Sequence, residues 1–214
     1  MTNKNLQRQA IVEEQKKKQT RTFLIVGGVI IALVLVFVLS KLLTAFTPRS
    51  EFSLGDPNAP VKVNVFSDFR CSHCAEFAEN QEDQFIKDYV DTGKVYYTFI
   101  NHPFLAADSM DAAVAASCAA QQGKFKEYSR ELFSRYTEPN AFTAANLGAY
   151  AQTLGLDMEK FNACSADSAT RSYINKGMLF GGKQGVTGTP SFLVNGKVVY
   201  SNALIQTVEA ELAK

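Results

Sequence analysis

The chain has 214 residues and a formal net charge of +1, a length that accommodates one globular domain of ordinary size and additional segments. Residues 44–214 contain 15 Lys or Arg against 19 Asp or Glu, a net charge of −4. This mildly acidic balance argues against a nucleic-acid partner, because nucleic acids are bound mainly through basic surfaces.

The N-terminal part of the chain combines a basic tail with an apolar segment. Residues 1–21 hold six Lys or Arg and two Glu, and every residue from Phe23 to Leu39 is apolar or Gly. About 20 such residues cross a bilayer as a helix, so we predict a single transmembrane helix over 22–43. The positive-inside rule keeps the tail in the cytoplasm and places the remainder of the chain outside it.

The alternative for this segment is a cleaved signal peptide. Signal peptides usually have an apolar core of about 7–15 residues that ends in a small-residue cleavage pattern. The apolar core here is longer, and the sequence after it, "KLLTAFTPRS", lacks that pattern. We therefore favour an uncleaved anchor in the cell membrane.

The sequence of residues 44–100, the first part of the region expected outside the cytoplasm, predicts the order β-α-β. Residues 44–59 form a polar linker with turn residues in "DPNAP". The alternation over 61–66 and the apolar run over 95–100 predict two strands. Between them, apolar residues recur at helical spacing from Phe77 to Val90 and predict a helix.

Residues 106–185 have a different character. They are rich in Ala, or carry Phe, Leu and Tyr at every third or fourth position, which predicts four or five short helices. Thr143 and Asp157 are typical N-caps, and Gly123 and Gly155 are typical helix ends. We therefore expect a helical block inside an α/β framework.

The C-terminal part returns to strands. Asn195-Gly196 separates two apolar runs and predicts a β-hairpin, and residues 202–214 predict an amphipathic helix. Thr189-Pro190 directly precedes the first of these strands. Because Pro has no N–H to donate within a sheet, we expect Pro190 at the start of the strand or on an edge.

Two of the four cysteines, Cys71 and Cys74, lie three positions apart where the first strand gives way to a helix. Outside the cytoplasm disulfides form and persist. The unpaired N–H groups and partial positive charge of a helix N-terminus stabilise a thiolate at Cys71, and Cys74 lies one turn later. The imidazole of His73 can also favour the thiolate, which makes a pair more oxidising. The spacing suits a reversible disulfide.

Two other roles are open to this cysteine pair. Half of a tetrahedral zinc site needs two further ligands. The chain offers four further nitrogen or sulfur ligands: His73, His102, Cys118 and Cys164. None of them forms a second close pair, so no metal is predicted. A purely structural disulfide between such near neighbours would hardly constrain the unfolded chain, and a redox role is favoured.

Four segments together, "GDPNAPV", "FSDFRCSHC", "AASCAAQQGKF" and "GTPSFLVNG", resemble the DsbA-like branch of the thioredoxin superfamily. The similarity runs from about Asp56 to the C-terminus. It implies an α/β thioredoxin fold formed by residues 60–103 and 186–214, with an inserted α-helical domain at 104–185. In this chain, the predicted transmembrane helix precedes that fold.

The same resemblance implies roles for individual residues and for partners. Cys71 is the attacked, exposed cysteine and Cys74 the buried one. Thr189 and a cis Pro190 face the disulfide and bind an extended substrate segment. The substrates are folding extracytoplasmic proteins with cysteines, and a membrane partner of the DsbB or vitamin K epoxide reductase kind reoxidises the pair. We expect a monomer without a cofactor.

The chain departs from the thioredoxin pattern at several positions. Thioredoxins usually have Trp before the first cysteine, where Arg70 stands here, and Gly-Pro between the cysteines. The oxidase pattern has Pro in place of Ser72, which leaves the redox potential open. Many relatives carry a buried carboxylate six positions before the first cysteine as proton acceptor, and this chain has Val65. Asp68 is nearer, but we expect it to cap the helix or face solvent.

The other two cysteines, Cys118 and Cys164, lie in the predicted helical block. A bond between them would close a loop of about 45 residues, worth roughly 4 kcal/mol in the chain-entropy model, and we favour this disulfide over two buried free thiols. His102 is expected to be a solvated or capping residue at a strand end. Four aromatic residues are expected in the core of the helical domain: Phe104, Tyr128, Phe133 and Phe142.

The sequence thus predicts an extracytoplasmic thiol-disulfide oxidoreductase that donates its Cys71-Cys74 disulfide to protein thiols through a mixed disulfide. A reductase or isomerase would use the same site with another direction of electron flow, although isomerases of this superfamily typically dimerise through an extra N-terminal domain. A chaperone or binding module without turnover is a further alternative. Both cysteines and Thr189-Pro190 argue against lost chemistry.

Overall fold

The computed structural model describes the following residues: 27, 28, 34 and 52–214. The chain divides into two units, Met1–Thr47 and Pro48–Lys214. None of the helices in the described ranges is long and apolar enough to cross a bilayer. The predicted transmembrane helix, 22–43, lies almost entirely outside the described residues, and the tail, 1–21, lies wholly outside them.

Within residues 52–214, five strands form one mixed sheet in the order β1-β3-β2-β4-β5. The strands are β1 (Phe52–Leu54), β2 (Val61–Ser67), β3 (Val95–Asn101), β4 (Ser191–Val194) and β5 (Lys197–Val199). The β2–β3 pair is parallel and the other pairs are antiparallel. Because a parallel pair needs a crossover connection, the helical segment between β2 and β3 is a requirement of the sheet.

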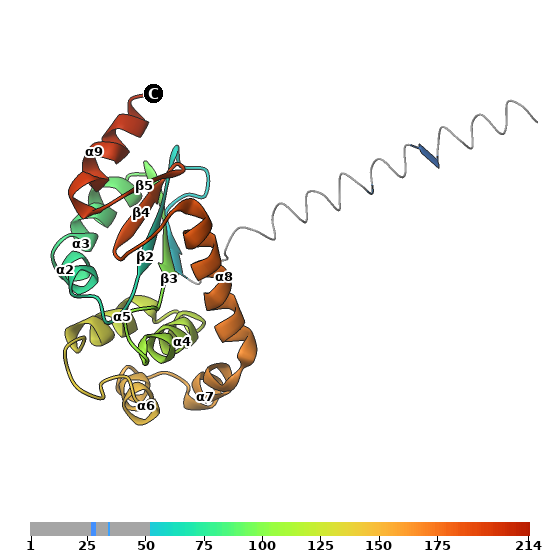
Figure 1. Ribbon diagram of the computed structural model, residues 1–214, viewed down its shortest axis with the longest axis vertical. Helices are drawn as coiled ribbons and strands as arrows, with labels where there is room; N and C mark the ends of the chain where they lie inside the picture. Colours follow the sequence, from blue (N-terminus) through green and yellow to red (C-terminus); the bar gives the residue numbers. More distant parts are fainter. Residues whose placement is uncertain (1–26, 29–33, 35–51) are drawn as a thin grey trace, which may run out of the picture. The chain divides into compact units, whose positions relative to one another are not determined.

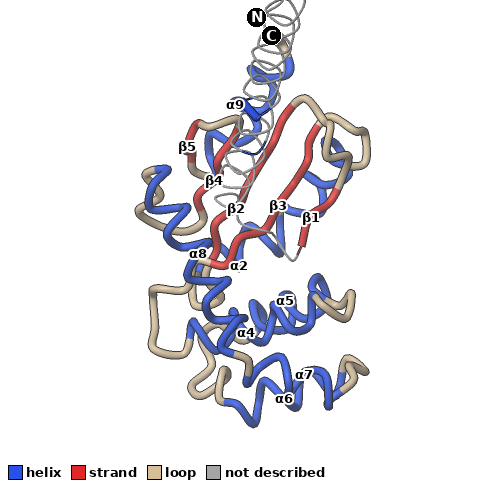
Figure 2. Tube along the Cα trace, turned by 90° about the vertical axis from the view of Figure 1, so that its right-hand side faces the viewer, coloured by secondary structure: helices blue, strands red, loops and turns tan. Residues whose placement is uncertain are grey.

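Helices cover both faces of the sheet and one of its ends. The helical elements are α2 (Ser72–Asn80), α3 (Glu82–Phe85), η1 (Ile86–Val90), α4 (Ser109–Ala120), α5 (Phe125–Ser134), α6 (Ala144–Thr153), α7 (Met158–Ala166), α8 (Ser168–Gln184) and α9 (Ser201–Leu212). Figure 1 shows α2, α3 and α9 on one face and α8 on the other. In both Figure 1 and Figure 2, α4 to α7 lie beyond the end of the sheet where β2 leads into α2.

The sheet separates two apolar clusters, which explains the sequence pattern of its central strand. Val61, Val63 and Val65 belong to the large cluster under α2 and α9, whereas Phe66 belongs to a small cluster on the face that α8 covers. Alternate side chains of a strand point to opposite faces. The predicted strand over 61–66 is therefore confirmed, with Ser67 added at its end.

The predicted helical block is confirmed, because α4 to α8 all lie between β3 and β4. Its predicted end signals also act as expected. The side chains of Thr143 and Asp157 accept hydrogen bonds from backbone N–H groups in the first turns of α6 and α7. Gly123 and Gly155 follow α4 and α6 with φ angles of +73° and +72°, a region that glycine enters without steric penalty.

The C-terminal hairpin is confirmed, and one predicted loop is wrong. Asn195 and Gly196 adopt φ angles of +44° and +87° between β4 and β5, as a tight hairpin turn requires. The predicted linker, 44–59, in contrast contains β1, which pairs antiparallel with β3. Three residues are too few to show a strand pattern, and pairing with the edge of β3 decides their conformation.

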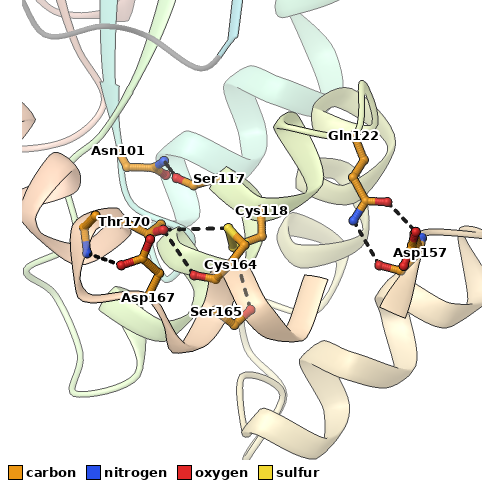
Figure 3. Close-up of a disulfide and its surroundings, with 10 residues drawn as sticks. Asn101, Ser117, Cys118, Gln122, Asp157, Cys164, Ser165, Asp167 and Thr170 are labelled. Carbon is orange, nitrogen blue, oxygen red and sulfur yellow. Dashed lines mark hydrogen bonds between the residues drawn. A yellow bond between two sulfur atoms is a disulfide. The ribbon is translucent and has the colours of Figure 1, made fainter. Parts of the chain in front are cut away.

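A disulfide joins the helices of the inserted block. Cys118 on α4 and Cys164 on α7 are bonded, with Cα atoms 5.7 Å apart and a sequence separation of 46. Figure 3 shows the bond between the two helices, with the hydroxyl groups of Ser165 and Thr170 beside it. The bond fastens α7 to the Ala-rich helix α4, whose small side chains supply little apolar area.

Removing this disulfide should destabilise the protein. For the Cys118→Ala/Cys164→Ala double variant, we expect a loss of about 2–4 kcal/mol in the free energy of unfolding, because the unfolded chain regains the freedom of a loop of 46 residues. Urea unfolding of the oxidised proteins measures it. An unchanged unfolding midpoint would contradict a stabilising role. Unfolding of both proteins in a reducing agent, where neither contains the bond, controls for the loss of the two side chains.

Candidate functional site

The two free cysteines lie at the junction of β2 and α2. Cys71 is the N-cap of α2, and its backbone carbonyl accepts a hydrogen bond from Ala75. No side-chain capping bond is present at this N-cap, so the first N–H groups of the helix are available to its sulfur. The residues Cys71 and Cys74 are 6% and 2% exposed. Cys71, which the resemblance implied to be exposed, is thus only the more accessible of two nearly covered thiols.

The environment pushes the two thiols in opposite directions. The pKa of Cys71 is lowered to about 6, and the largest cause is a hydrogen bond from the side chain of Cys74. The side chain of Thr189 and the backbone N–H groups of Cys74 and His73 lower this pKa further, whereas burial opposes the shift. Burial, followed by the interaction with Cys71, strongly raises the pKa of Cys74. Cys71 is therefore the nucleophile and Cys74 holds its proton.

The loop before β4 covers the sulfur of Cys71. The Thr189-Pro190 peptide bond is cis, and the Cys71 thiol donates to the carbonyl oxygen of Thr189 over 3.1 Å. The hydroxyl oxygen of Thr189 is buried and has no hydrogen-bond partner among the described residues. That hydroxyl can donate to the thiolate once Cys71 loses its proton. Residues far apart in the sequence thus meet at one sulfur.

His73 contributes to the thiolate through its backbone. Its N–H group is one of the causes that lower the pKa of Cys71. Its side chain is 78% exposed, and its Nδ1 lies 3.5 Å from the carboxylate of Glu76 on the next turn. The effect of the imidazole on Cys71 stays a prediction.

Asp68 fixes the turn before Cys71 from the inside. It is 1% exposed, so the expectation that it faces solvent is wrong. Its carboxylate accepts hydrogen bonds from the backbone N–H groups of Arg70, Phe104 and Leu105 at 2.8–2.9 Å, and from the hydroxyl of Ser109 at 2.8 Å. A buried carboxylate is stable when such donors replace its water. Asp68 therefore ties the turn to the start of the helical domain.

Arg70 makes the second connection to the helical domain. Its guanidinium donates from Nε and Nη2 to both oxygens of Asp108, and from Nη1 to the carbonyl oxygens of Tyr136 and Glu138 at 2.7 and 3.0 Å. The same group stacks on the ring of Phe142, 4.1 Å from the ring centroid. The planar fork of Arg suits several acceptors at once. The sequence showed only that Arg70 stands where thioredoxins usually have Trp.

Two of our predictions are wrong for the loop after β3. His102 is buried rather than solvated, with its ring against Phe66 and Phe104, and burial lowers its pKa. Tyr128, Phe133 and Phe142 are buried as predicted, but Phe104 is 46% exposed. Asp68 holds the backbone of Phe104 and Leu105 at the surface, an effect that local sequence cannot reveal.

The residues that the structure describes contain no group of three or more His, Cys, Asp or Glu arranged to hold a metal ion. The site comprises the two thiols, the cis-Pro loop, and an apolar rim formed by the exposed Phe104 and Leu105, whose backbone N–H groups are bonded to Asp68 in the turn before Cys71. Such an arrangement can exchange a disulfide with a thiol, because one sulfur is nucleophilic and the other is protected.

Alkylation should reveal the asymmetry of the two thiols. In the reduced protein, the rate of Cys71 alkylation by iodoacetamide should rise as the pH increases through about 6 and then level off, because its pKa lies near 6. An ordinary thiol shows this rise near about 8.5. Mass spectrometry of peptides from samples quenched at each pH measures both cysteines. A midpoint near 8.5, or equal labelling of Cys74, would contradict the assignment.

Loss of the Arg70 side chain should weaken the attachment of the helical domain. We expect Arg70→Ala to reduce the free energy of unfolding by about 2–3 kcal/mol, since several charge-assisted hydrogen bonds are lost and Asp108 keeps a charge without its partner. Arg171→Ala is the matched control, because it breaks an exposed Arg–Asp pair between α8 and α4 worth less than about 1 kcal/mol. Equal effects in urea unfolding would refute the special role of Arg70.

Comparison with known proteins agrees with this geometry. A family model described as thioredoxin matches residues 47–213. A probable disulfide bond formation protein D of Bacillus cereus is 29% identical over 177 residues, which cover 79% of this chain and 82% of that protein. The Na(+)/H(+) antiporter NhaA 3 of Salinispora tropica is 31% identical over 160 residues, which cover 73% of this chain but only 23% of that protein.

Solved structures place the fold in the same group. The crystal structure of oxidised BdbD from Bacillus subtilis aligns with a TM-score of 0.65 and 25% sequence identity, and the alignment covers 76% of this chain and 92% of that chain. The family match extends over most of the chain, and the paired thiols lie at the strand-to-helix junction described above. The chain therefore belongs to the thioredoxin family, within its DsbA-like group of thiol-disulfide oxidoreductases.

Proposed function

We propose that this protein is a membrane-anchored, extracytoplasmic oxidase that donates the Cys71-Cys74 disulfide to the thiols of secreted or membrane proteins. The observation that carries the proposal is the position of Cys71 at the N-terminus of α2, beside Cys74 and against Thr189. This position lowers the pKa of Cys71 to about 6. A stable Cys71 thiolate stabilises the reduced form of the pair, and a pair whose reduced form is stable is a strong oxidant of other thiols.

The reaction proceeds by two displacements. A substrate thiolate attacks the sulfur of Cys71, the bond between the cysteines breaks, and Cys74 leaves with the electron pair and gains a proton. A second substrate thiolate attacks the substrate sulfur of this mixed disulfide and displaces the Cys71 thiolate. The substrate loses two electrons and gains a disulfide, and the enzyme is left with two thiols.

The rim of the site supports an unfolded protein as substrate. Phe104 and Leu105 are exposed apolar residues, and their backbone is bound to Asp68, whose carbonyl oxygen accepts the N–H of Cys71. These two adjacent side chains offer apolar area that an unfolded segment can bury. The cis-Pro loop on the other side of Cys71 offers backbone groups to an extended segment.

The cellular location rests on the sequence of the N-terminal part. The basic tail, 1–21, and the apolar segment, 22–43, support a single-pass anchor with the N-terminus in the cytoplasm. A protein disulfide donor requires an oxidising compartment, which agrees with a catalytic domain outside the cytoplasm. The protein is proposed to act as a monomer and to be reoxidised by a quinone-linked membrane protein of the DsbB or vitamin K epoxide reductase type.

Trapping of thiols in intact cells tests the direction of electron flow. Cells are quenched with acid, the free thiols are alkylated, and the state of Cys71 and Cys74 is determined by mass spectrometry. A mainly oxidised pair is the expected result. A mainly reduced pair would support a reductase or isomerase instead.

A companion variant tests turnover on protein substrates. Without Cys74, the enzyme has no second thiol that can displace a partner from Cys71. Cys74→Ala should therefore accumulate mixed disulfides between Cys71 and extracytoplasmic proteins. Cys71→Ala is the matched control and should trap none. Failure of Cys74→Ala to trap any partner would favour a binding module without turnover.

A further inference from the structure

His102 is a buried titratable residue that the two displacement steps do not use. It directly follows β3, and only 8% of the residue is exposed. Its backbone N–H donates to the carbonyl oxygen of Ser67 over 2.8 Å, which holds it beside the end of β2, where the chain turns toward Cys71. Burial lowers the pKa of His102, so its imidazole is neutral at pH 7 and suits apolar surroundings.

The imidazole ring lies in a slot that β2 and α8 form together. The ring of Phe66 on β2 meets it edge to face, with the ring centroids 5.8 Å apart. On the side of α8, Gly181 has no side chain. A Cβ at this position would lie 3.1 Å from Cε1 of His102 and 2.9 Å from the ring of Phe66, closer than packed carbon atoms prefer. The missing side chain of Gly181 therefore makes room for both rings.

Phe104 packs against another side of the His102 ring. The two ring centroids are 5.6 Å apart and the ring planes cross at 72°, which is the edge-to-face arrangement that aromatic pairs prefer. Pro103 lies buried between the two residues and restricts the backbone that joins them. Phe104 itself is 46% exposed. His102 thus contacts this rim residue from the inside, and the outer part of Phe104 is open to a substrate.

The backbone and the side chain of Phe104 have separate supports. The carboxylate of Asp68 accepts its backbone N–H at 2.8 Å, whereas its ring packs on His102. The Nδ1 atom of His102 is buried and has no hydrogen-bond partner among the described residues, so the imidazole supports Phe104 by packing. A side chain that is ordered before the substrate arrives avoids an entropy cost at binding.

We propose that His102 is a positioning residue of the active-site rim, and that its ring holds Phe104 in the orientation that accepts an apolar side chain beside the reacting cysteine of a substrate. The inference rests on the proposed function and deepens it, because it names the residue that makes the rim selective. His102 touches no reacting atom and takes no part in the transfer of electrons. Its loss therefore changes the preference among substrates.

Two peptides measure this preference. Each contains two cysteines, and they differ only in a Leu or a Ser next to the first cysteine. The oxidised full-length protein, held in lipid nanodiscs so that no detergent competes for the rim, is mixed with either peptide. Acid quenching, alkylation and intact-mass analysis follow the reduction of Cys71 and Cys74. The rate with the Leu peptide divided by the rate with the Ser peptide is the apolar preference.

In His102→Ala, we expect the apolar preference to fall by about three- to tenfold, because the Phe104 ring then has to be ordered at binding. His102→Phe keeps a ring in the slot and should restore most of the wild-type preference. Phe104→Ala should also lower the preference, and His102→Ala should add nothing in that background, because it acts through Phe104. A wild-type preference in His102→Ala, or a further fall in the double variant, would overturn the proposal.

A pair of glycine variants covers the case in which His102→Ala does not fold. Gly181→Ala places a Cβ against the rings of His102 and Phe66, whereas at Gly182, its neighbour on α8, a Cβ meets no described atom within 4 Å outside the backbone of its own helix. Gly181→Ala should lower the apolar preference, and Gly182→Ala is the matched control that should keep it. Equal preferences in these two variants would overturn the proposal. If the wild-type protein reacts with neither peptide, the proposed function fails together with the inference.

Discussion

The site depends on the rigid attachment of a four-residue turn, 68–71, to both parts of the fold. Asp68 holds the backbone of the loop after β3, Phe69 packs its ring between Phe99 and Phe133, and Arg70 is bound to the helical domain. Three adjacent side chains therefore point into three different environments. Cys71, the next residue, has little freedom and lies at the N-terminus of α2 under the cis-Pro loop.

This attachment makes the electrostatic asymmetry of the thiols possible. A helix N-terminus lowers the pKa of a thiol only when the sulfur stays against the free N–H groups. With the turn fixed, Cys71 receives the backbone N–H groups of α2 and the bond from Cys74, while Cys74 points into the core. The chemical difference between two identical side chains is thus a difference of position.

Much of the framework could be predicted from the chain, because short-range patterns produce it. The alternation in β2, the caps at Thr143 and Asp157, and the turn at Asn195-Gly196 act locally, and each is found as expected. Long-range contacts decided the rest. β1 is a strand only because the edge of β3 is available to it, and Phe104 is exposed because Asp68 binds its backbone.

The sequence by itself determined that a reversible disulfide is possible, because two cysteines lie one helical turn apart at a strand-to-helix junction, and the distant Thr189-Pro190 favoured this redox role over a metal site. The length of the apolar run and the charge of the tail also predict the anchor, which stays a prediction. Only the tertiary structure decided which groups surround the thiols. Thr189 and Cys71 are 118 positions apart, and Arg70 and Asp108 are 38 apart. Such pairs meet because the sheet and its crossover bring them together, and no local pattern records that meeting.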